Sequence, residues 1–363
     1  MTPPRHILHV DLDQFIAAVE ILRHPELRGK SVVVGGSGDP SQRGVVSTAS
    51  YEARRYGVAS GMPLRTAARR CPEAVFLPVD GPAYHAASDQ VMATLRTLPA
   101  VVEVAGWDEA FLEVDSDDPV SFARELQRAV LDRTGLSCSV GIGQNKLHAK
   151  IASGMDKPGG VFVLTAENWF GVMGSRPVEA LWGVGGKTGR RLAAFGIRTV
   201  RDLAGADEVV LAGAFGPNTG PWLRALARGD GPDRVHPEPH VARSTSRETT
   251  FQRDLVDPEA IRAEVRRLAR QVVDDVGRLG RPATRVVVKV RFAPFVTATH
   301  GVAVAPPSMD PAEVEAAALA ALERFELDRP VRLLGVRAEL RPPDDVIPPG
   351  DALPLGAAGP EGP

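Results

Sequence analysis

The chain has 363 residues, of which 44% are hydrophobic and 24% are charged, as in ordinary globular proteins. This length exceeds what one hydrophobic core usually organises, so two or more domains are expected. The formal net charge of −2 excludes a strongly basic chain, but nucleic-acid binding depends on where the charges lie.

Membrane and disulfide-based classes are also excluded. No apolar run reaches the roughly 18 residues that a membrane-spanning helix needs, and the N-terminus lacks the apolar core of a signal peptide. The two cysteines, Cys71 and Cys138, are too few for a disulfide framework or a four-cysteine zinc site. We therefore expect a cytoplasmic protein without a membrane partner.

The first predicted elements are a buried strand and an amphipathic helix within residues 6–20, HILHVDLDQFIAAVE. The apolar strand ends abruptly at Asp11 and Asp13, and Phe15 and Ile16 then begin a series at helical spacing. Buried carboxylates are costly unless a helix terminus or a cation compensates them. Asp13 is positioned to cap the helix, so Asp11 remains the candidate metal ligand.

Mixed strands and helices are predicted as far as about residue 170. Residues 111–115, FLEVD, alternate apolar and acidic side chains as a half-buried strand does, and residues 137–143, SCSVGIG, are typical of a buried strand. The glycine-rich segment 33–40, VVGGSGDP, indicates an exposed loop, because no G-x-G-x-x-G pattern follows.

A second acidic pair, Asp108 and Glu109, immediately precedes the strand predicted at 111–115. Adjacent acids are commonly just solvated charges, but two strand ends could bring this pair next to Asp11. Three such carboxylates repel one another unless cations bind them. Oxygen ligands at incomplete coordination suit Mg²⁺, which keeps water and takes substrate phosphates. Two such ions about 3.5–4 Å apart support in-line phosphoryl displacement.

The segment from about 168 to 233 predicts short helices, preceded in part by the glycine-rich residues 183–186. Residues 234–241, RVHPEPHV, contain two prolines and predict a linker. We interpret its two histidines as ordinary linker residues rather than as a metal site. Residues 342–363 are rich in proline and glycine and predict a disordered tail.

Residues 242–341 predict the order βαββαβ, with helices on one face of a four-stranded sheet. Asp257 is expected to cap the first of the two helices. In the strand TRVVVKVRF, strict alternation places the valines toward the core and Arg285, Lys289 and Arg291 on the opposite face. This unit carries more basic than acidic residues, unlike the whole chain.

Five segments together resemble the Y-family translesion DNA polymerases of the DinB, or DNA polymerase IV-like, type. They are VDLDQFIAAVE, VVSTASYEARRYGVASGMPLRTA, GWDEAFLEV, SCSVGIGQNKLHAKIASGMDKPGG and LWGVGGKTGRRLAAFGIRTVRDLA. The resemblance runs in order through nearly the whole chain and implies an α/β (α+β) right-hand fold. Its domains would be a palm at 1–21 and 81–167, fingers at 22–80, a thumb at 168–233, a linker at 234–241 and a little finger at 242–341.

The resemblance also implies how an active site is built. Asp11, Asp108 and Glu109 match the family's ligands for two divalent cations, Mg²⁺ or alternatively Mn²⁺. The backbone carbonyl of Leu12 would also contact the second ion. The first ion would lower the pKa of the primer 3′-hydroxyl, and the second would hold the triphosphate and the departing pyrophosphate. The triphosphate would also be bound by Thr48, Tyr51, Arg54 and Lys157.

Two groups of residues are expected to contact primer–template DNA. The segment WGVGGKTG resembles a helix-hairpin-helix, whose backbone N–H groups approach a DNA phosphate; its residues are Gly183, Gly185, Gly186 and Lys187. The little finger would contribute Arg243, Arg247, Arg285, Lys289 and Arg291, although a merely solvated face is the alternative. None of these contacts reads base sequence, as a polymerase that accepts any template requires.

Ile16 departs from the family pattern, because most members have phenylalanine or tyrosine there. That ring packs under the incoming sugar and excludes a 2′-hydroxyl, so the position is named the steric gate. Isoleucine lacks the flat ring, and a lost clash of this kind is worth roughly 1–3 kcal/mol. We therefore predict weak discrimination against ribonucleotides. The alternative is that Phe15 or a neighbour shifts to close the gap.

Two further departures are evident. Gly106 and Trp107 stand where the family has serine and a smaller apolar residue, and the tryptophan could either fill the core or move the primer terminus. The tail lacks the glutamine-led peptide by which many bacterial relatives dock on the sliding clamp, so clamp binding through the tail is doubtful.

Together these features predict a template-directed, error-prone DNA polymerase for translesion synthesis and DNA repair, acting as a monomer on dNTPs and tolerating rNTPs. One rival is a non-catalytic primer–template-binding protein that keeps the fold, which the retained acids Asp11, Asp108 and Glu109 disfavour. Another is a nucleotidyl cyclase with a similar palm. A cyclase has no duplex to hold, so the helix-hairpin-helix and the little finger argue against it.

Overall fold

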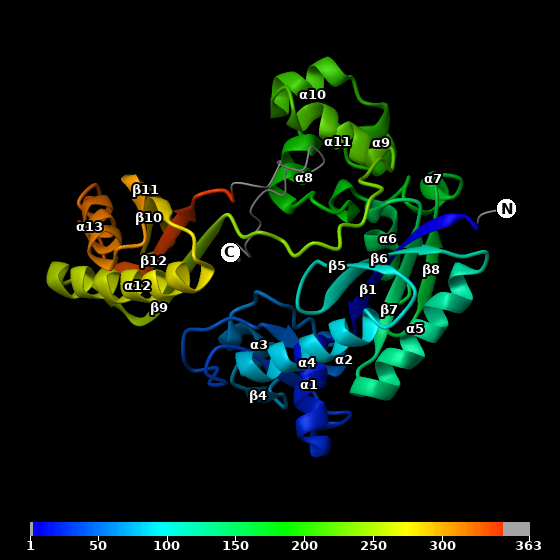
Figure 1. Cartoon of the computed structure of the whole chain (residues 1–363), viewed down its shortest axis with the longest axis horizontal. Coiled ribbons are helices and arrows are strands. Elements are labelled where there is room, and N and C mark those ends of the chain that lie inside the picture. Colours follow the sequence, from blue (N-terminus) through cyan, green and yellow to red (C-terminus); the bar gives the residue numbers. More distant parts are fainter. Residues whose placement is uncertain (1–2, 344–363) are drawn as a thin grey trace.

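The computed structural model describes residues 3–343 and arranges them as three sheets and a helical segment (Figure 1). None of the helices in this described part of the chain combines the length and the apolar character that a membrane span requires. Of the disordered tail predicted at 342–363, residues 344–363 lie outside the described residues, and the expectation about a clamp-binding peptide falls there as well.

The largest sheet of the N-terminal half has the order β5-β6-β1-β7-β8. Its strands are β1 (Arg5–Leu12), β5 (Val101–Val104), β6 (Glu109–Asp115), β7 (Cys138–Gly143) and β8 (Val161–Leu164). The central strand β1 pairs antiparallel with both β6 and β7, and the register sets Asp11 opposite Glu109 on one side and Ser139 on the other. The ends of strands that are distant in sequence therefore meet at one end of the sheet.

Helices cover both faces of this sheet. One face packs against α1 (Phe15–Arg23), α4 (Gly81–Leu95) and α5 (Pro119–Thr134), and the other against α6 (Lys146–Ser153). Side chains alternate along β1, so Leu8 and Val10 join the first core while Ile7 faces α6. The covering of both faces explains why the apolar runs of these strands are nearly continuous.

Glycines in β7 allow α6 to lie directly on the sheet. A Cβ at Gly141 would come 2.0 Å from the backbone oxygen of Ala149, and one at Gly143 would come 2.4 Å from the Cβ of His148. Any side chain at either position would push the helix away. The segment SCSVGIG thus brings the side chains of α6 close to those of β1.

A small sheet of order β3-β2-β4 follows α1 and the short η1 (Pro25–Leu27). It consists of β2 (Val32–Val34), β3 (Thr48–Ala49) and β4 (Val75–Leu77), with helices α2 (Tyr51–Arg54) and α3 (Leu64–Arg70) beside it. The glycine-rich segment 33–40 contains the end of β2 and a loop, and no dinucleotide-binding helix follows it.

The helical segment contains short helices around one apolar core. They are α7 (Trp169–Val172), η2 (Val178–Ala180), α8 (Gly186–Ala193), α9 (Val200–Gly205), α10 (Glu208–Phe215) and α11 (Thr219–Ala227). Thr199 and Asp202 form a capping box that fixes the start of α9. Between residues 230 and 243 the chain has neither helix nor strand, and it crosses to the C-terminal sheet (Figure 1).

The C-terminal unit has the predicted order βαββαβ. Its elements are β9 (Ser244–Leu255), α12 (Pro258–Leu279), β10 (Ala283–Phe292), β11 (Val296–Ser308), α13 (Pro311–Leu322) and β12 (Val331–Leu340), and the strand order is β11-β10-β12-β9. Asp257 caps α12 as predicted, by accepting a hydrogen bond from the backbone N–H of Glu259. The alternating valines of β10 lie in the core under both helices.

The C-terminal sheet also contacts the loop between β2 and β3. The backbone N–H of Arg43 donates to Gln252 Oε1 (2.7 Å), and Gln252 Nε2 donates back to the Arg43 carbonyl (2.9 Å). The Arg43 guanidinium donates to the Phe251 carbonyl (2.9 Å) and pairs with Asp254. These contacts join segments about 200 residues apart.

Candidate active site

The three acids predicted as metal ligands lie where the central strand β1 ends and its neighbour β6 begins, at one end of the five-stranded sheet. Asp11 is near the end of β1, and Glu109 begins the neighbouring strand β6 directly opposite it. Asp108 precedes β6, and its backbone carbonyl accepts a hydrogen bond from the N–H of Leu12 (2.8 Å). Alternation along β1 and β6 places the side chains of Asp11 and Glu109 on the face that α6 covers.

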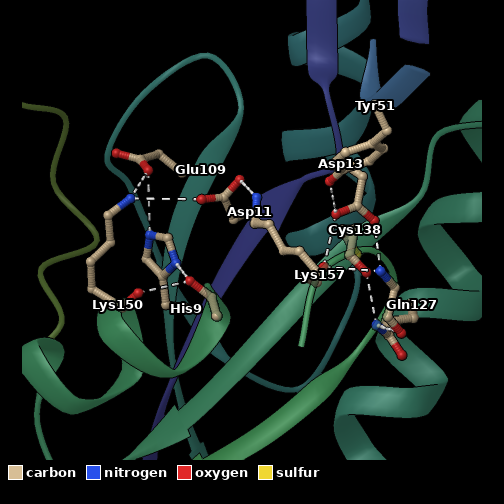
Figure 2. Close-up of polar contacts among 12 residues, drawn as sticks. His9, Asp11, Asp13, Tyr51, Glu109, Gln127, Cys138, Lys150 and Lys157 are labelled. Carbon is tan, nitrogen blue, oxygen red and sulfur yellow. Dashed lines mark hydrogen bonds and ion pairs between the residues drawn. The ribbon is translucent and has the colours of Figure 1, made fainter. Parts of the chain in front are cut away.

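Two lysines reach these acids (Figure 2). Lys157, in the loop between α6 and β8, forms an ion pair with Asp11 Oδ1. Lys150 of α6 forms an ion pair with Glu109 Oε2, and its Nζ is 3.8 Å from Asp11 Oδ2. The sequence analysis predicted that Lys157 binds the triphosphate, and it did not identify Lys150. The available signal was the strand alternation, which predicts that Asp11 faces whichever helix covers that side.

The acids differ in how readily they are protonated. Burial raises the pKa of Asp108, and the nearby charges of Asp11 and Glu109 raise it further. Burial also raises the pKa of Glu109, but the neighbouring His9 and Lys150 outweigh it and bring that pKa down to about 2. Glu109 therefore stays ionised at neutral pH, and Asp108 is the more readily protonated of the two.

The donor set suits a hard divalent cation that is incompletely coordinated by protein. Among residues 3–343 no three or more His, Cys, Asp or Glu side chains are gathered as a ready-made metal cage. The three acids nonetheless lie close enough to perturb one another. Mg²⁺ commonly takes only one or two carboxylates and completes its shell with water and phosphate oxygens, so these residues fit it.

Asp13 does not cap α1, so that prediction is wrong. The N-cap position belongs to Gln14, which has a left-handed backbone (φ 45°) and makes no side-chain cap. The Asp13 carboxylate is buried instead, 2% exposed. It accepts hydrogen bonds from the Ser139 hydroxyl (2.8 Å), the Gly159 N–H (2.9 Å) and the Tyr51 hydroxyl (3.1 Å). Strand register and loop closure, both long-range effects, decide this environment.

Through these bonds Asp13 connects the loop that carries Lys157 with the start of α2 (Figure 2). Gln127 of α5 supports the same loop by donating to the carbonyls of Gly159 (3.0 Å) and Gly160 (3.2 Å). The hydrogen bonds of its loop, in addition to its own ion pair, therefore keep Lys157 next to Asp11.

Three of the four residues predicted to bind a triphosphate lie together around α2, and each of them bonds within the protein; the fourth, Lys157, lies in the loop between α6 and β8. The Thr48 hydroxyl donates to the Ser47 carbonyl (2.9 Å), and Arg54 Nε donates to the Ala49 carbonyl (2.9 Å). The Arg54 guanidinium is 5.0 Å from the centre of the Tyr51 ring. Gln14 Oε1 accepts the Tyr51 N–H (2.6 Å), which ties α2 to the acidic edge.

Ile16 and Phe15 have different environments at the start of α1. Phe15 is buried in the core, 3% exposed, whereas Ile16 is only partly buried at its margin. A shift of Phe15 to the gate position would take its ring out of that core. Trp107 is 42% exposed and rests against the ring of His85 on α4, with centroids 4.3 Å apart, so it does not fill the core.

The residues predicted to contact DNA fall in two places. Gly183 has a positive φ of 95°, and Gly185, Gly186 and Lys187 form the N-terminus of α8. On the C-terminal sheet, Lys289 pairs with Glu248 (3.1 Å) and Arg291 Nε donates to Thr297 (2.9 Å). Those side chains and the exposed Arg285 share the face that the helices leave uncovered.

Two of the predicted DNA-binding residues belong to strand β9 or its approach. Arg247 is held by Asp275 of α12 at 2.7 Å, which gives it a role within the protein. Arg243 is exposed, and its backbone carbonyl accepts the N–H of Leu340 (2.9 Å). The long-range ion pair of Arg247 is not visible in the sequence pattern.

Comparison with known proteins gives concordant matches. The model of the impB/mucB/samB family matches residues 10–154, and that of its C-terminal domain matches residues 242–345. The chain is 55% identical over 341 residues to "DNA polymerase IV 2" of Mycobacterium tuberculosis, covering 93% of this chain and 98% of the relative. It is 40% identical over 348 residues to "DNA polymerase IV" of Methanoculleus marisnigri, covering 93% and 95%.

Solved structures show the same similarity. The "Y-family DNA polymerase chimera Dbh-Dpo4(243-245)-Dbh" has a TM-score of 0.81 at 27% identity, over 92% of this chain and 98% of that one. The "Insertion ternary complex of Dbh DNA polymerase" has a TM-score of 0.63 at 26% identity, over the same shares. Sequence and fold thus point to the same group of proteins.

Proposed function

Because this chain belongs to the Y-family DNA polymerases of the DNA polymerase IV type, we propose that it joins nucleotides to a primer by a two-metal mechanism at Asp11, Asp108 and Glu109. The right-hand architecture and the DNA-directed polymerase activity follow from the family. The observation that carries the proposal is the convergence of the three acids at the end of β1.

The chain's own residues would bind and orient the substrates there. When bound, two divalent cations would activate the primer 3′-hydroxyl and neutralise the triphosphate and the leaving pyrophosphate. Asp11, Asp108 and Glu109 would supply their carboxylate ligands, together with the carbonyl of Leu12. The Thr48 and Tyr51 hydroxyls would donate to phosphate oxygens, and Arg54 and Lys157 would add charge-assisted bonds. Each would exchange an internal partner for phosphate.

Each domain would contact a different part of the primer–template or of the incoming nucleotide. The palm at 1–21 and 81–167 would supply the acids, the fingers at 22–80 would supply Thr48, Tyr51 and Arg54, and the thumb at 168–233 would present the glycines that precede α8. The little finger at 242–341 presents the uncovered basic face of its sheet. These groups contact phosphates rather than base edges, which suits a monomeric polymerase that accepts any template, including damaged DNA.

Sugar selection should be weak. The partly buried Ile16 has no ring to place under the incoming sugar, and Phe15 is fixed in the core. Restoring the ring with Ile16→Phe should reduce ribonucleotide incorporation relative to deoxyribonucleotide incorporation by roughly 10–200-fold.

The decisive experiment is primer extension on a DNA hairpin, with dNTPs and rNTPs in parallel, for wild type, Asp108→Ala and Ile16→Phe. Extension with both sugars, abolished in Asp108→Ala and made deoxy-selective in Ile16→Phe, supports both parts. Extension by wild type with dNTPs alone would refute the open gate and keep the polymerase. DNA binding without extension, despite Mg²⁺ or Mn²⁺, would favour the non-catalytic alternative.

A further inference from the structure

The ammonium group of Lys150 lies among the acids of the proposed metal site, and the mechanism above gives it no role (Figure 2). It pairs with Glu109 Oε2 and lies 3.8 Å from Asp11 Oδ2. The lysine side chain is 20% exposed and the two acids 20% and 27%, so solvent screens these interactions only partly. Lys150 thus bridges two of the three carboxylates.

Helix α6 fixes this lysine against the acids. The helix begins at the Asn145 cap, and it lies directly on the glycines of β7. Ser153 lies one turn after Lys150 on this helix. Its hydroxyl donates to the carbonyl of Lys150 (2.9 Å) and lies 2.8 Å from Nδ1 of His9 on β1. The backbone under Lys150 is therefore tied to the same strand that carries Asp11.

At this end of the sheet the negative charges outnumber the positive ones. Asp11, Asp108 and Glu109 are three acids, whereas two lysines, Lys150 and Lys157, pair with Asp11 and Glu109. Asp11 turns one oxygen toward each lysine, and Glu109 turns toward Lys150. These pairs explain why the three carboxylates are close in space and yet form no preassembled cage.

We propose that Lys150 is a positioning residue that acts as the resident counter-ion of the metal site. It holds Asp11 and Glu109 in place until a divalent cation replaces its ammonium group at the same oxygens. Since Lys157 shares Asp11, the same exchange frees Lys157 for the triphosphate. The inference rests on the proposed function, because it takes these acids as the metal ligands.

Binding of Mn²⁺ to the full-length protein, measured by electron paramagnetic resonance without DNA or nucleotide, tests this directly. Lys150→Met removes the competing charge and keeps most of the side-chain volume, so Mn²⁺ should bind about ten-fold more tightly than to wild type. The matched control is Lys146→Met, one turn earlier on α6. Lys146 forms an equivalent pair with Glu103 (2.6 and 2.7 Å), away from the acids, so its loss should leave Mn²⁺ affinity unchanged.

Thermal unfolding gives a second readout that does not depend on activity. In EDTA, Lys150→Met should melt below wild type, because three carboxylates then repel one another with one lysine fewer. Added Mg²⁺ should raise the melting temperature of this variant more than that of wild type, because a ligand at a given concentration stabilises the folded state more when it binds more tightly.

An Asp11→Ala variant separates the two ways in which the idea can fail. If Asp11→Ala abolishes Mn²⁺ binding and Lys150→Met binds no more tightly than wild type, the counter-ion role is overturned while the metal site stands. If Asp11→Ala binds Mn²⁺ like wild type, the acids are not the metal site, and both proposals fall. Tighter binding in Lys146→Met as well would show a general charge effect and overturn the specific role of Lys150.

Discussion

The palm and the little finger each contain a cluster of charged side chains, and the two clusters are built differently. In the little finger a single acid, Asp275 of α12, accepts hydrogen bonds from the Arg247 guanidinium (2.7 Å) and the Thr245 hydroxyl (3.2 Å) and pairs with Arg278. In the palm, two lysines pair with Asp11 and Glu109, and Asp108 is a third acid nearby. The little-finger cluster has more positive than negative charges, and the palm cluster has more negative than positive charges.

This difference separates a structural cluster from a binding site. Arginine offers several fixed donors and stays charged, so it satisfies a buried carboxylate in one geometry. The lysine ammonium is a compact charge on a flexible stem, which another cation can replace. A surplus of carboxylates costs stability in the free protein and is relieved by an added cation or by protonation. The palm cluster is therefore suited to bind metal, and the little-finger cluster to hold β9 against α12.

The sharpest test of this contrast is Asp11→Asn. The substitution keeps the volume of the side chain and removes one of the three charges, so we expect kcat/KM for dNTP incorporation to fall by about 10³-fold. The melting temperature in EDTA should not fall, because charge repulsion decreases. A variant that retains more than a tenth of wild-type activity would contradict the assignment of Asp11.

Asp275→Ala should have the opposite profile. It leaves Arg247 and Arg278 without their common partner; Asp275 is 6% exposed, but the two arginine side chains are 47% and 70% exposed. We expect the free energy of unfolding, measured in urea, to fall by about 2–3 kcal/mol, toward the low end for a broken buried pair. Extension activity at a temperature well below unfolding should persist. Unchanged stability would show that the pair is only a surface contact.

Asp13→Asn tests the hydrogen-bonded link between the two halves of the proposed triphosphate site. All three partners of Asp13 are donors, and an amide offers one acceptor oxygen where the carboxylate offers two. At least one donor should lose its partner, so the KM for dNTP should rise by about ten-fold while DNA affinity stays the same. Ser139→Ala, which removes a single donor, should have a smaller effect. Equal loss of DNA binding would indicate general misfolding instead.

The smallest predicted effect concerns the uncovered face of the little finger. Replacing Arg285, Lys289 and Arg291 with glutamine should weaken DNA binding uniformly across sequences and reduce the slope of log K against log salt by up to about 3. Arg247→Gln is the comparison, because its guanidinium is held by Asp275. If Arg247→Gln changes the salt slope as much as one of the three, the structural role assigned to it is incomplete.

Much of the architecture was predictable because it depends on local patterns. The βαββαβ order, the cap at Asp257 and the outward row of Arg285, Lys289 and Arg291 all follow from side-chain periodicity and capping chemistry. The meeting of Asp11 with Asp108 and Glu109 was also predictable, since acids at the ends of strands can share an edge. Their roles as metal ligands stay a prediction until metal binding is measured.

The sequence by itself determined the elements, the family and the candidate acids, because periodicity and motif spacing are properties of short segments. Only the tertiary structure decided the partners of the charges. Asp13 became a buried acceptor rather than a helix cap, Lys150 reached Glu109, and Arg247 turned to Asp275. Each of these pairs joins side chains from different elements. Pairing therefore depends on strand register and helix packing, which no local pattern records.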